Sequence, residues 1–165
     1  MKTLKKLSLI AISLCLVLVM SACSPVALIG SLSGGGDNSL ETFYEKLTRS
    51  QELLDTVADD IYDYWYDCIY DDAYGEDINL AIAMAQIDNE ENLAELEALD
   101  VEISDLFQKV KDGKHSDAAK SAMSAYGDYY EHVVNVSGSF NSYSADKETL
   151  KKAFASALRE LSYEL

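Results

Sequence analysis

From Leu40 to Leu165 the chain contains no proline, and glycine occurs there only at positions 75, 113, 127 and 138. Proline breaks helices and glycine weakens them, so a long stretch nearly free of both favours helical structure. Three of the four glycines lie between segments of regular apolar spacing, where helices end. Strands would show alternating apolar and polar residues, and this part of the sequence has no such pattern. The spacing therefore predicts an all-helical fold.

Apolar residues recur at the interval expected for helices that are buried on one side. In the first segment they are seven residues apart, at Leu40, Leu47, Leu54, Ile61 and Cys68. Similar patterns follow later in the chain, and together they predict four helices, two long and two shorter, over residues 39–73, 78–111, 116–136 and 145–164. Short connections between such helices favour an antiparallel helical bundle.

Two details of these helices can be predicted from their polar residues. Asn89 and Asn92 interrupt the apolar pattern of the second helix, so we expect a bend or break near them. Residues 137–144 are polar with scattered aromatics, which is typical of a loop. Ser144 is then the expected N-cap of the last helix, because a serine hydroxyl can accept a hydrogen bond from the first turn.

The beginning of the chain has a different character. Lys2, Lys5 and Lys6 precede an apolar run from Leu7 to Met20, which only two serines interrupt. The run is 14 residues long, whereas a helix needs about 20 to cross a bilayer. A basic start followed by a short apolar run is typical of a secretory signal.

The run ends in Met20-Ser21-Ala22-Cys23, which resembles the lipobox of bacterial lipoproteins. The resemblance implies that residues 1–22 are a signal peptide that is removed, and that the thiol of Cys23 carries two acyl chains, such as palmitate, through a thioether. Two chains hold a protein stably at a bilayer. The expected location is the extracytoplasmic face of the cell membrane. The remainder of the chain is similar to small helical lipoproteins of Gram-positive bacteria.

The segment after Cys23 is expected to be a tether. Glycine and serine dominate residues 24–39, which also contain the only proline of the chain, Pro25. A flexible segment of this length reaches about 20–25 Å. We therefore expect three parts: the signal peptide 1–22, the lipidated cysteine with its tether 23–39, and one acidic helical-bundle domain over 40–165.

Charge excludes one class of partner. Residues 1–22 carry three of the 13 basic residues and none of the 29 acidic ones, so the remainder has a formal charge of −19. Nucleic-acid binding needs basic residues that neutralise phosphates, so no nucleic-acid partner is expected. A partner in the cell envelope or a cationic ligand remains compatible with this charge.

Aromatic and acidic residues are concentrated near the end of the first helix. Six aromatics fall within residues 61–74, and no Lys or Arg occurs between Ser50 and Lys109. Helical spacing places four aspartates in a line and two tyrosines on the side away from the core. This candidate ligand or cation face consists of Asp60, Asp63, Tyr66, Asp67, Tyr70 and Asp71. The alternative is a solvated acidic surface, with the tyrosines packed against neighbouring helices.

No residue pattern of a known catalytic or metal site is present in the sequence. Of the two histidines, His115 is expected to be an exposed turn residue, and His132 a surface or partly buried helix residue. Cys68 has acidic neighbours and a core position, so it is expected to be a small buried side chain rather than a nucleophile. We therefore expect no catalytic residues, no metal site and no cofactor.

The sequence thus supports three functions, in this order. The first is a lipid-anchored, non-enzymatic binding or interaction module. The second is a surface protein that binds divalent cations with the acidic helix face. The third is an enzyme of the cell envelope.

Overall fold

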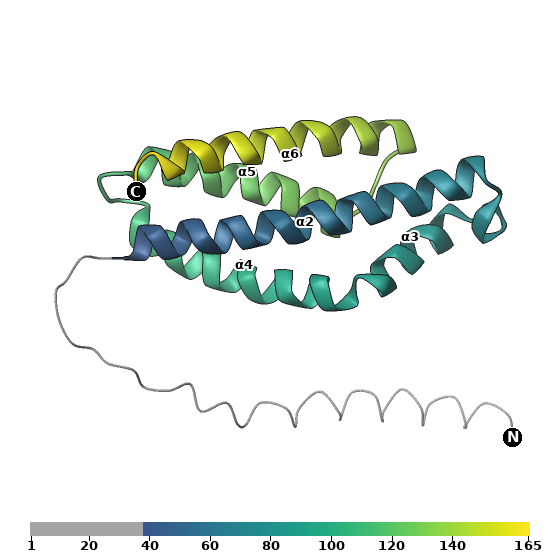
Figure 1. Ribbon diagram of the computed structural model, residues 1–165, viewed down its shortest axis with the longest axis horizontal. Helices are drawn as coiled ribbons and strands as arrows, with labels where there is room; N and C mark the ends of the chain where they lie inside the picture. The colour runs from purple at the N-terminus through teal and green to yellow at the C-terminus, as the bar shows by residue number, and fades with distance from the viewer. Residues whose placement is uncertain (1–37) are drawn as a thin grey trace, which may run out of the picture. The chain divides into compact units, whose positions relative to one another are not determined.

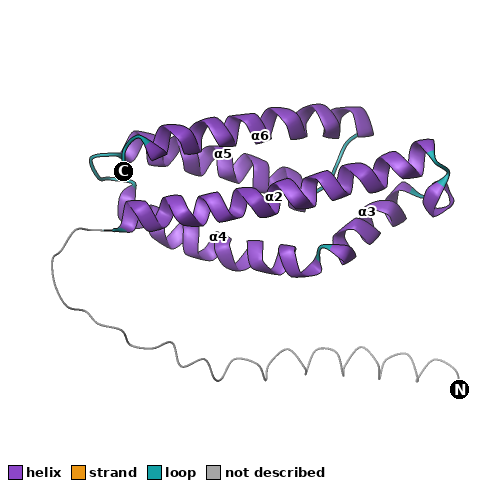
Figure 2. Cartoon of the chain, viewed as in Figure 1, coloured by secondary structure: helices purple, strands orange, loops and turns teal. Residues whose placement is uncertain are grey.

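The computed structural model describes residues 38–165, and every regular element in this range is helical, as Figure 2 shows. The elements are α2 (Ser39–Tyr70), the 3₁₀ helix η1 (Ala73–Glu76), α3 (Ile78–Asp88), α4 (Glu90–Val110), α5 (Ser116–Val134) and α6 (Phe140–Ser162). The predicted all-α bundle is confirmed. The predicted signal peptide, Cys23 and all but the last two residues of the predicted tether lie outside the described range.

Helix α2 is the longest helix and the centre of the arrangement (Figure 1). It packs against α3, α4, α5 and α6, while α4 also contacts α5 and α5 packs along α6. The described residues 38–165 lie in one compact unit, and its hydrophobic core is built from residues between Phe43 and Leu161. The predicted heptad positions Leu47, Leu54 and Ile61 are fully buried in that core. No helix of the described range is long and apolar enough to cross a membrane.

The expected break in the second helix is confirmed, and it lies at Asn89. The side chain of Asn89 is buried and donates from Nδ2 to Asp60 Oδ2 at 2.8 Å and to the carbonyl oxygen of Ala85 at 3.0 Å. Asn92 in turn donates to Asn89 Oδ1 at 2.8 Å. The break divides the segment into α3 and α4, so that two shorter helices follow the length of α2. A buried amide needs such partners, which explains why an asparagine stands there.

The start of the last helix was predicted wrongly. Helix α6 begins at Phe140, and its N-cap is Ser139, not Ser144, which lies inside the helix. Ser139 and Ser142 form a capping box, in which each side chain bonds the backbone N–H of the other residue. These two bonds satisfy amides that would otherwise lack partners at the helix end. The segment predicted as a loop over 137–144 is therefore mostly helical.

Gly138, next to this cap, is expected to be intolerant of a side chain. Its φ is +89°, and an added Cβ would lie 2.7 Å from Ser142 Oγ. We expect Gly138→Ala to destabilise the domain by about 1–2 kcal/mol. Gly127 is the matched control, because it lies within α5 with no neighbouring atom within 4 Å of an added Cβ. Gly127→Ala should stabilise by about 0.5–1 kcal/mol. Urea unfolding of both variants measures the difference, and equal effects would contradict the prediction.

Candidate functional site

The end of α2 carries the tyrosines that were predicted to face away from the core, and this exposure is confirmed. Tyr66 is 41% exposed and Tyr70 is 57% exposed. Their ring centroids are 4.6 Å apart, and each ring lies 6.2 Å from the ring of Phe140. Phe140 also stacks on Tyr62 at 5.1 Å. We refer to Tyr62, Tyr66, Tyr70 and Phe140 as the tyrosine cluster.

Phe140 was not predicted to be part of this site. It was assigned to a loop, because the cap at Ser139 was not recognised. Phe140 is the first residue of α6 and stands about 70 positions after Tyr70 in the chain. Its ring packs against the tyrosine rings at the end of α2. Aromatic pairs of this kind contribute about 0.5–1.5 kcal/mol beyond the area they bury. The cluster is therefore held in place although two of its rings are exposed.

The four predicted aspartates have different surroundings. Asp60 is half-buried and accepts the hydrogen bond from Asn89. Asp63 and Asp71 are exposed, and Asp67 is half-buried. Within residues 38–165, none of these carboxylates forms an ion pair. Nor does any group of three His, Cys, Asp or Glu in that range come together in a way that could hold a metal ion.

One helical turn before Asp63 and Tyr66, α2 carries another aspartate and tyrosine, and a lysine of α6 contacts both of them. Lys147 Nζ lies 2.6 Å from Asp59 Oδ1 and 4.5 Å from the centroid of the Tyr62 ring. Its side chain is only 8% exposed, so the ammonium group is largely removed from water. A cation held by a carboxylate and the face of an aromatic ring is a favourable arrangement. The Lys147 ammonium group is thus held by both the Asp59 carboxylate and the Tyr62 ring.

The same pair of residue types repeats twice more along α2. Asp59 and Tyr62 are followed at four-residue intervals by Asp63 with Tyr66 and by Asp67 with Tyr70. Residues four apart lie on the same side of a helix, so the pairs form successive steps. Within the described range, a lysine contacts only the first step, Asp59 with Tyr62. Helix α6 runs antiparallel to α2 and begins at Phe140, and α2 continues past that point in Figure 1.

The turn after α2 has an unusual backbone conformation. Asp72, Tyr74 and Glu76 have φ of 52°, 57° and 61°. This left-handed conformation costs about 1–2 kcal/mol for each residue that is not glycine. Tyr74 stacks on Tyr64 at 5.3 Å, and the Tyr64 hydroxyl donates to Asp88. These contacts fasten the turn and α3 to α2.

The two histidines do not form a reactive site. His132 is partly buried, as predicted, and stacks on Tyr143 at 4.5 Å. Burial lowers the pKa of its imidazole below the ordinary value, so the neutral form is favoured. His115 lies in a turn, as predicted, but it is half-buried rather than exposed and contacts Glu164 near the end of the chain.

Cys68 also lacks the surroundings of a nucleophile. It is buried, as predicted, and burial raises the pKa of its thiol, with a further contribution from the Asp77 carboxylate. A reactive cysteine needs the opposite shift, because the thiolate is the nucleophile.

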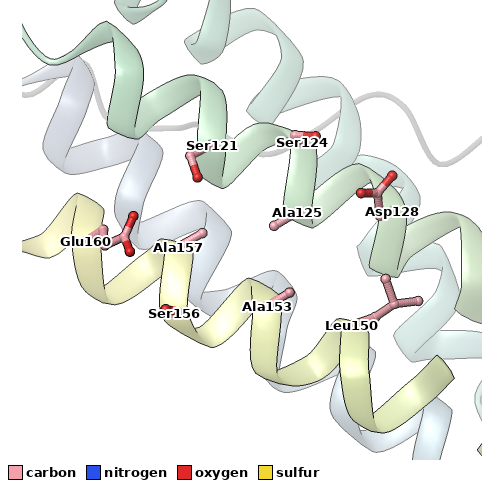
Figure 3. Close-up of a pocket in the computed structure, with 9 residues that line it drawn as sticks. All are labelled: Ser121, Ser124, Ala125, Asp128, Leu150, Ala153, Ser156, Ala157 and Glu160. Carbon is pink, nitrogen blue, oxygen red and sulfur yellow. The ribbon is translucent and has the colours of Figure 1, made fainter. Parts of the chain in front are cut away.

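A surface groove with a volume of about 390 Å³ lies between α5 and α6. Figure 3 shows the residues that line it. Small side chains form its middle, and the carboxylates of Asp128 and Glu160 lie toward its two ends (Figure 3). Within the described range no hydrogen bond links Ser121, Ser124 or Ser156 to a basic side chain. A serine nucleophile needs such a base.

No protein-family model, curated protein or solved structure matches the chain. Function is therefore inferred from the residues and their geometry.

Proposed function

We propose that this protein is a lipid-anchored, non-enzymatic binding module of the cell envelope, and that the end of α2 binds cationic groups of a partner. The observation that carries the proposal is the repeat along α2. Lys147 binds to Asp59 and Tyr62, and the next two aspartate–tyrosine steps present the same groups without a lysine. A lysine, arginine or organic ammonium group from outside can bind to those free steps in the same way.

The exposed tyrosine rings support this ligand class. A cation placed over an aromatic face gains about 0.5–1 kcal/mol at an exposed site and about 2 kcal/mol where water is excluded. Asp63 and Asp67 add opposite charge beside those rings. Within the described range neither of these two carboxylates forms an ion pair. An anionic ligand is disfavoured by the same charges.

The position of the cluster agrees with a lipid anchor at Cys23. The chain enters the described domain next to Ser39, where α2 begins, and the tyrosine cluster lies at the other end of α2. The 32 residues of α2 span about 48 Å at 1.5 Å per residue. The free steps thus lie at the end of α2 opposite Ser39, the residue at which the helix begins.

The proposal is tested by binding of an oligolysine peptide to residues 36–165, measured by calorimetry. Exchanging both exposed tyrosines, Tyr66→Ser and Tyr70→Ser, should weaken binding by about tenfold or more, since two cation–π contacts are lost. The matched control is Tyr163→Ser, because Tyr163 is 78% exposed but lies after α6. Its affinity should be unchanged. Equal affinities of the two variants would show that the peptide responds only to overall charge, and would refute the site.

A further inference from the structure

Helix α3 has two apolar sides, and only one of them is covered. Ala81 and Ala85 are fully buried on the side that packs against α2. The other side carries apolar residues at positions i, i+3, i+4 and i+7 of the helix, which we call the outer stripe of α3. The outer stripe consists of Leu80, Ala83, Met84 and Ile87. Leu80 is 46% exposed and Ile87 is 61% exposed.

No helix of the described domain lies over the outer stripe. Helix α3 contacts α2, η1 and α4, and it has no contact with α5 or α6. A surface helix of a soluble domain normally carries polar residues on the side away from its core. Grouped apolar side chains on a surface typically mark an interaction site. The outer stripe therefore has the spacing of a helix–helix contact but lacks its second helix.

Acidic residues border the outer stripe at both ends. Asp77 caps the start of α3 and accepts hydrogen bonds from the backbone N–H groups of Asn79 and Leu80. Glu90 and Glu91 follow its end, and both are exposed and form no ion pair within the described range. The nearest basic residues along the chain are Arg49 and Lys109. The apolar side chains thus lie within a border of uncompensated negative charge.

We propose that the outer stripe of α3 is the docking surface for a basic amphipathic helix of another protein. Apolar residues of that helix would cover Leu80 and Ile87, and its Lys or Arg residues would meet the acidic border. Charge distinguishes this occupant from two others. A second copy of the chain would bring an equal set of acids to the contact, which is unfavourable. An anionic bilayer surface would be repelled in the same way.

This docking surface goes beyond the cation-binding steps on α2, because the two surfaces have no residue in common. The two surfaces should also differ in the kind of ligand that they bind. The tyrosine cluster needs only a cationic group, whereas the outer stripe needs apolar side chains as well. Variants of one surface can therefore be measured while the other is intact.

The experiment uses a synthetic amphipathic helix of leucine and lysine, with the same helix carrying glutamate for each lysine as its control. Both are titrated into residues 36–165, and binding is measured by fluorescence anisotropy. The lysine helix should bind with an affinity that falls as NaCl is raised, and the glutamate helix should not bind. Exchanging both Leu80→Ser and Ile87→Ser should weaken the affinity by about tenfold or more, since each side chain loses buried apolar area.

Two control variants separate this surface from the rest of the molecule. Val101 is 62% exposed on α4, so Val101→Ser removes a similar exposed apolar side chain elsewhere and should leave the affinity unchanged. The tyrosine cluster can also bind the lysines of this helix, so the titration is repeated in a background of Tyr66→Ser with Tyr70→Ser. In that background Leu80→Ser with Ile87→Ser should still weaken the affinity. Circular dichroism establishes that each variant keeps its helix content.

Three results would overturn the proposal. The first is equal binding of the lysine and glutamate helices. The second is an affinity that Leu80→Ser with Ile87→Ser leaves unchanged. The third is a dimer in sedimentation equilibrium, or binding of the protein to phosphatidylglycerol vesicles, if the exchanges Leu80→Ser and Ile87→Ser abolish it. That third result would assign the outer stripe to a second copy of the chain or to lipid.

Discussion

Exchanging Cys23 for alanine is expected to abolish membrane attachment of the protein. If the proposed lipid anchor is right, the thiol of Cys23 is the only point at which acyl chains can be attached. Two acyl chains hold a protein stably because each buried methylene contributes about 0.8 kcal/mol. Loss of the acyl chains should release all of the protein from the membrane fraction, not only a part of it.

The measurement is incorporation of labelled palmitate in a bacterial host, together with the distribution of protein between membrane and other fractions. Cys23→Ala should lose all label. The matched controls are Cys15→Ala and Cys68→Ala, the other two cysteines of the chain. Both should keep the label. Label that persists in Cys23→Ala, or that disappears in Cys15→Ala, would refute lipidation at Cys23.

The second large effect is expected at Asp59. Its carboxylate is the counter-charge of Lys147, whose side chain is only 8% exposed, and it also lies 3.6 Å from Lys151 Nζ. Asp59→Asn would leave a largely buried ammonium group without its carboxylate. Removing one partner of a buried ion pair costs about 3–5 kcal/mol, and we expect about 2–3 kcal/mol because Asp59 itself is half exposed to water.

Comparison with Lys147→Met tests the physical reason. Replacing the buried cation by an apolar side chain of similar length removes the charge and its desolvation cost together, so the change in stability should be below about 1 kcal/mol. The variant with both exchanges should recover most of the stability that Asp59→Asn loses. The matched control is Glu148→Gln, since the Glu148–Lys152 pair is exposed and such pairs contribute about 0–1 kcal/mol.

These variants are measured by urea unfolding at constant ionic strength, because each of them changes the net charge of an acidic domain. Equal destabilisation by Asp59→Asn and Glu148→Gln would contradict the prediction. It would mean that the Lys147 ammonium group is effectively solvated, and the comparison with the free steps on α2 would lose its basis.

Local patterns in the sequence were sufficient to predict most of the fold. The heptad residues Leu47, Leu54 and Ile61 identify the buried side of α2, because apolar spacing determines which side of a helix packs. Asn89 marks the break between α3 and α4 for an equally local reason, since a buried amide must find hydrogen-bond partners. The exposure of Tyr66 and Tyr70 follows from the same register.

The parts that could not be predicted depend on tertiary contacts. Asp59 and Lys147 are 88 positions apart in sequence, and spacing alone does not pair two helices in register. A local signal was nevertheless present, because Lys147 lies at a core position of the apolar pattern that runs through Tyr143, Leu150 and Phe154. A lysine at such a position needs a nearby carboxylate as its counter-charge. The cap at Ser139 was missed because its partner is Ser142, whereas Glu or Gln is the usual residue there.

The central claim is that the free aspartate–tyrosine steps of α2 bind a cationic group, and the most direct measurement is a nuclear magnetic resonance titration. Residues 36–165, with labelled tyrosine rings, are titrated with oligolysine, with CaCl₂ and with NaCl at matched ionic strength. The proposal predicts that oligolysine shifts the ring signals of Tyr66 and Tyr70 in a saturable manner and leaves Tyr163 unchanged. Shifts of similar size at all exposed tyrosines, or shifts that NaCl reproduces, would contradict it. Saturable shifts caused only by CaCl₂ would instead indicate a divalent-cation site.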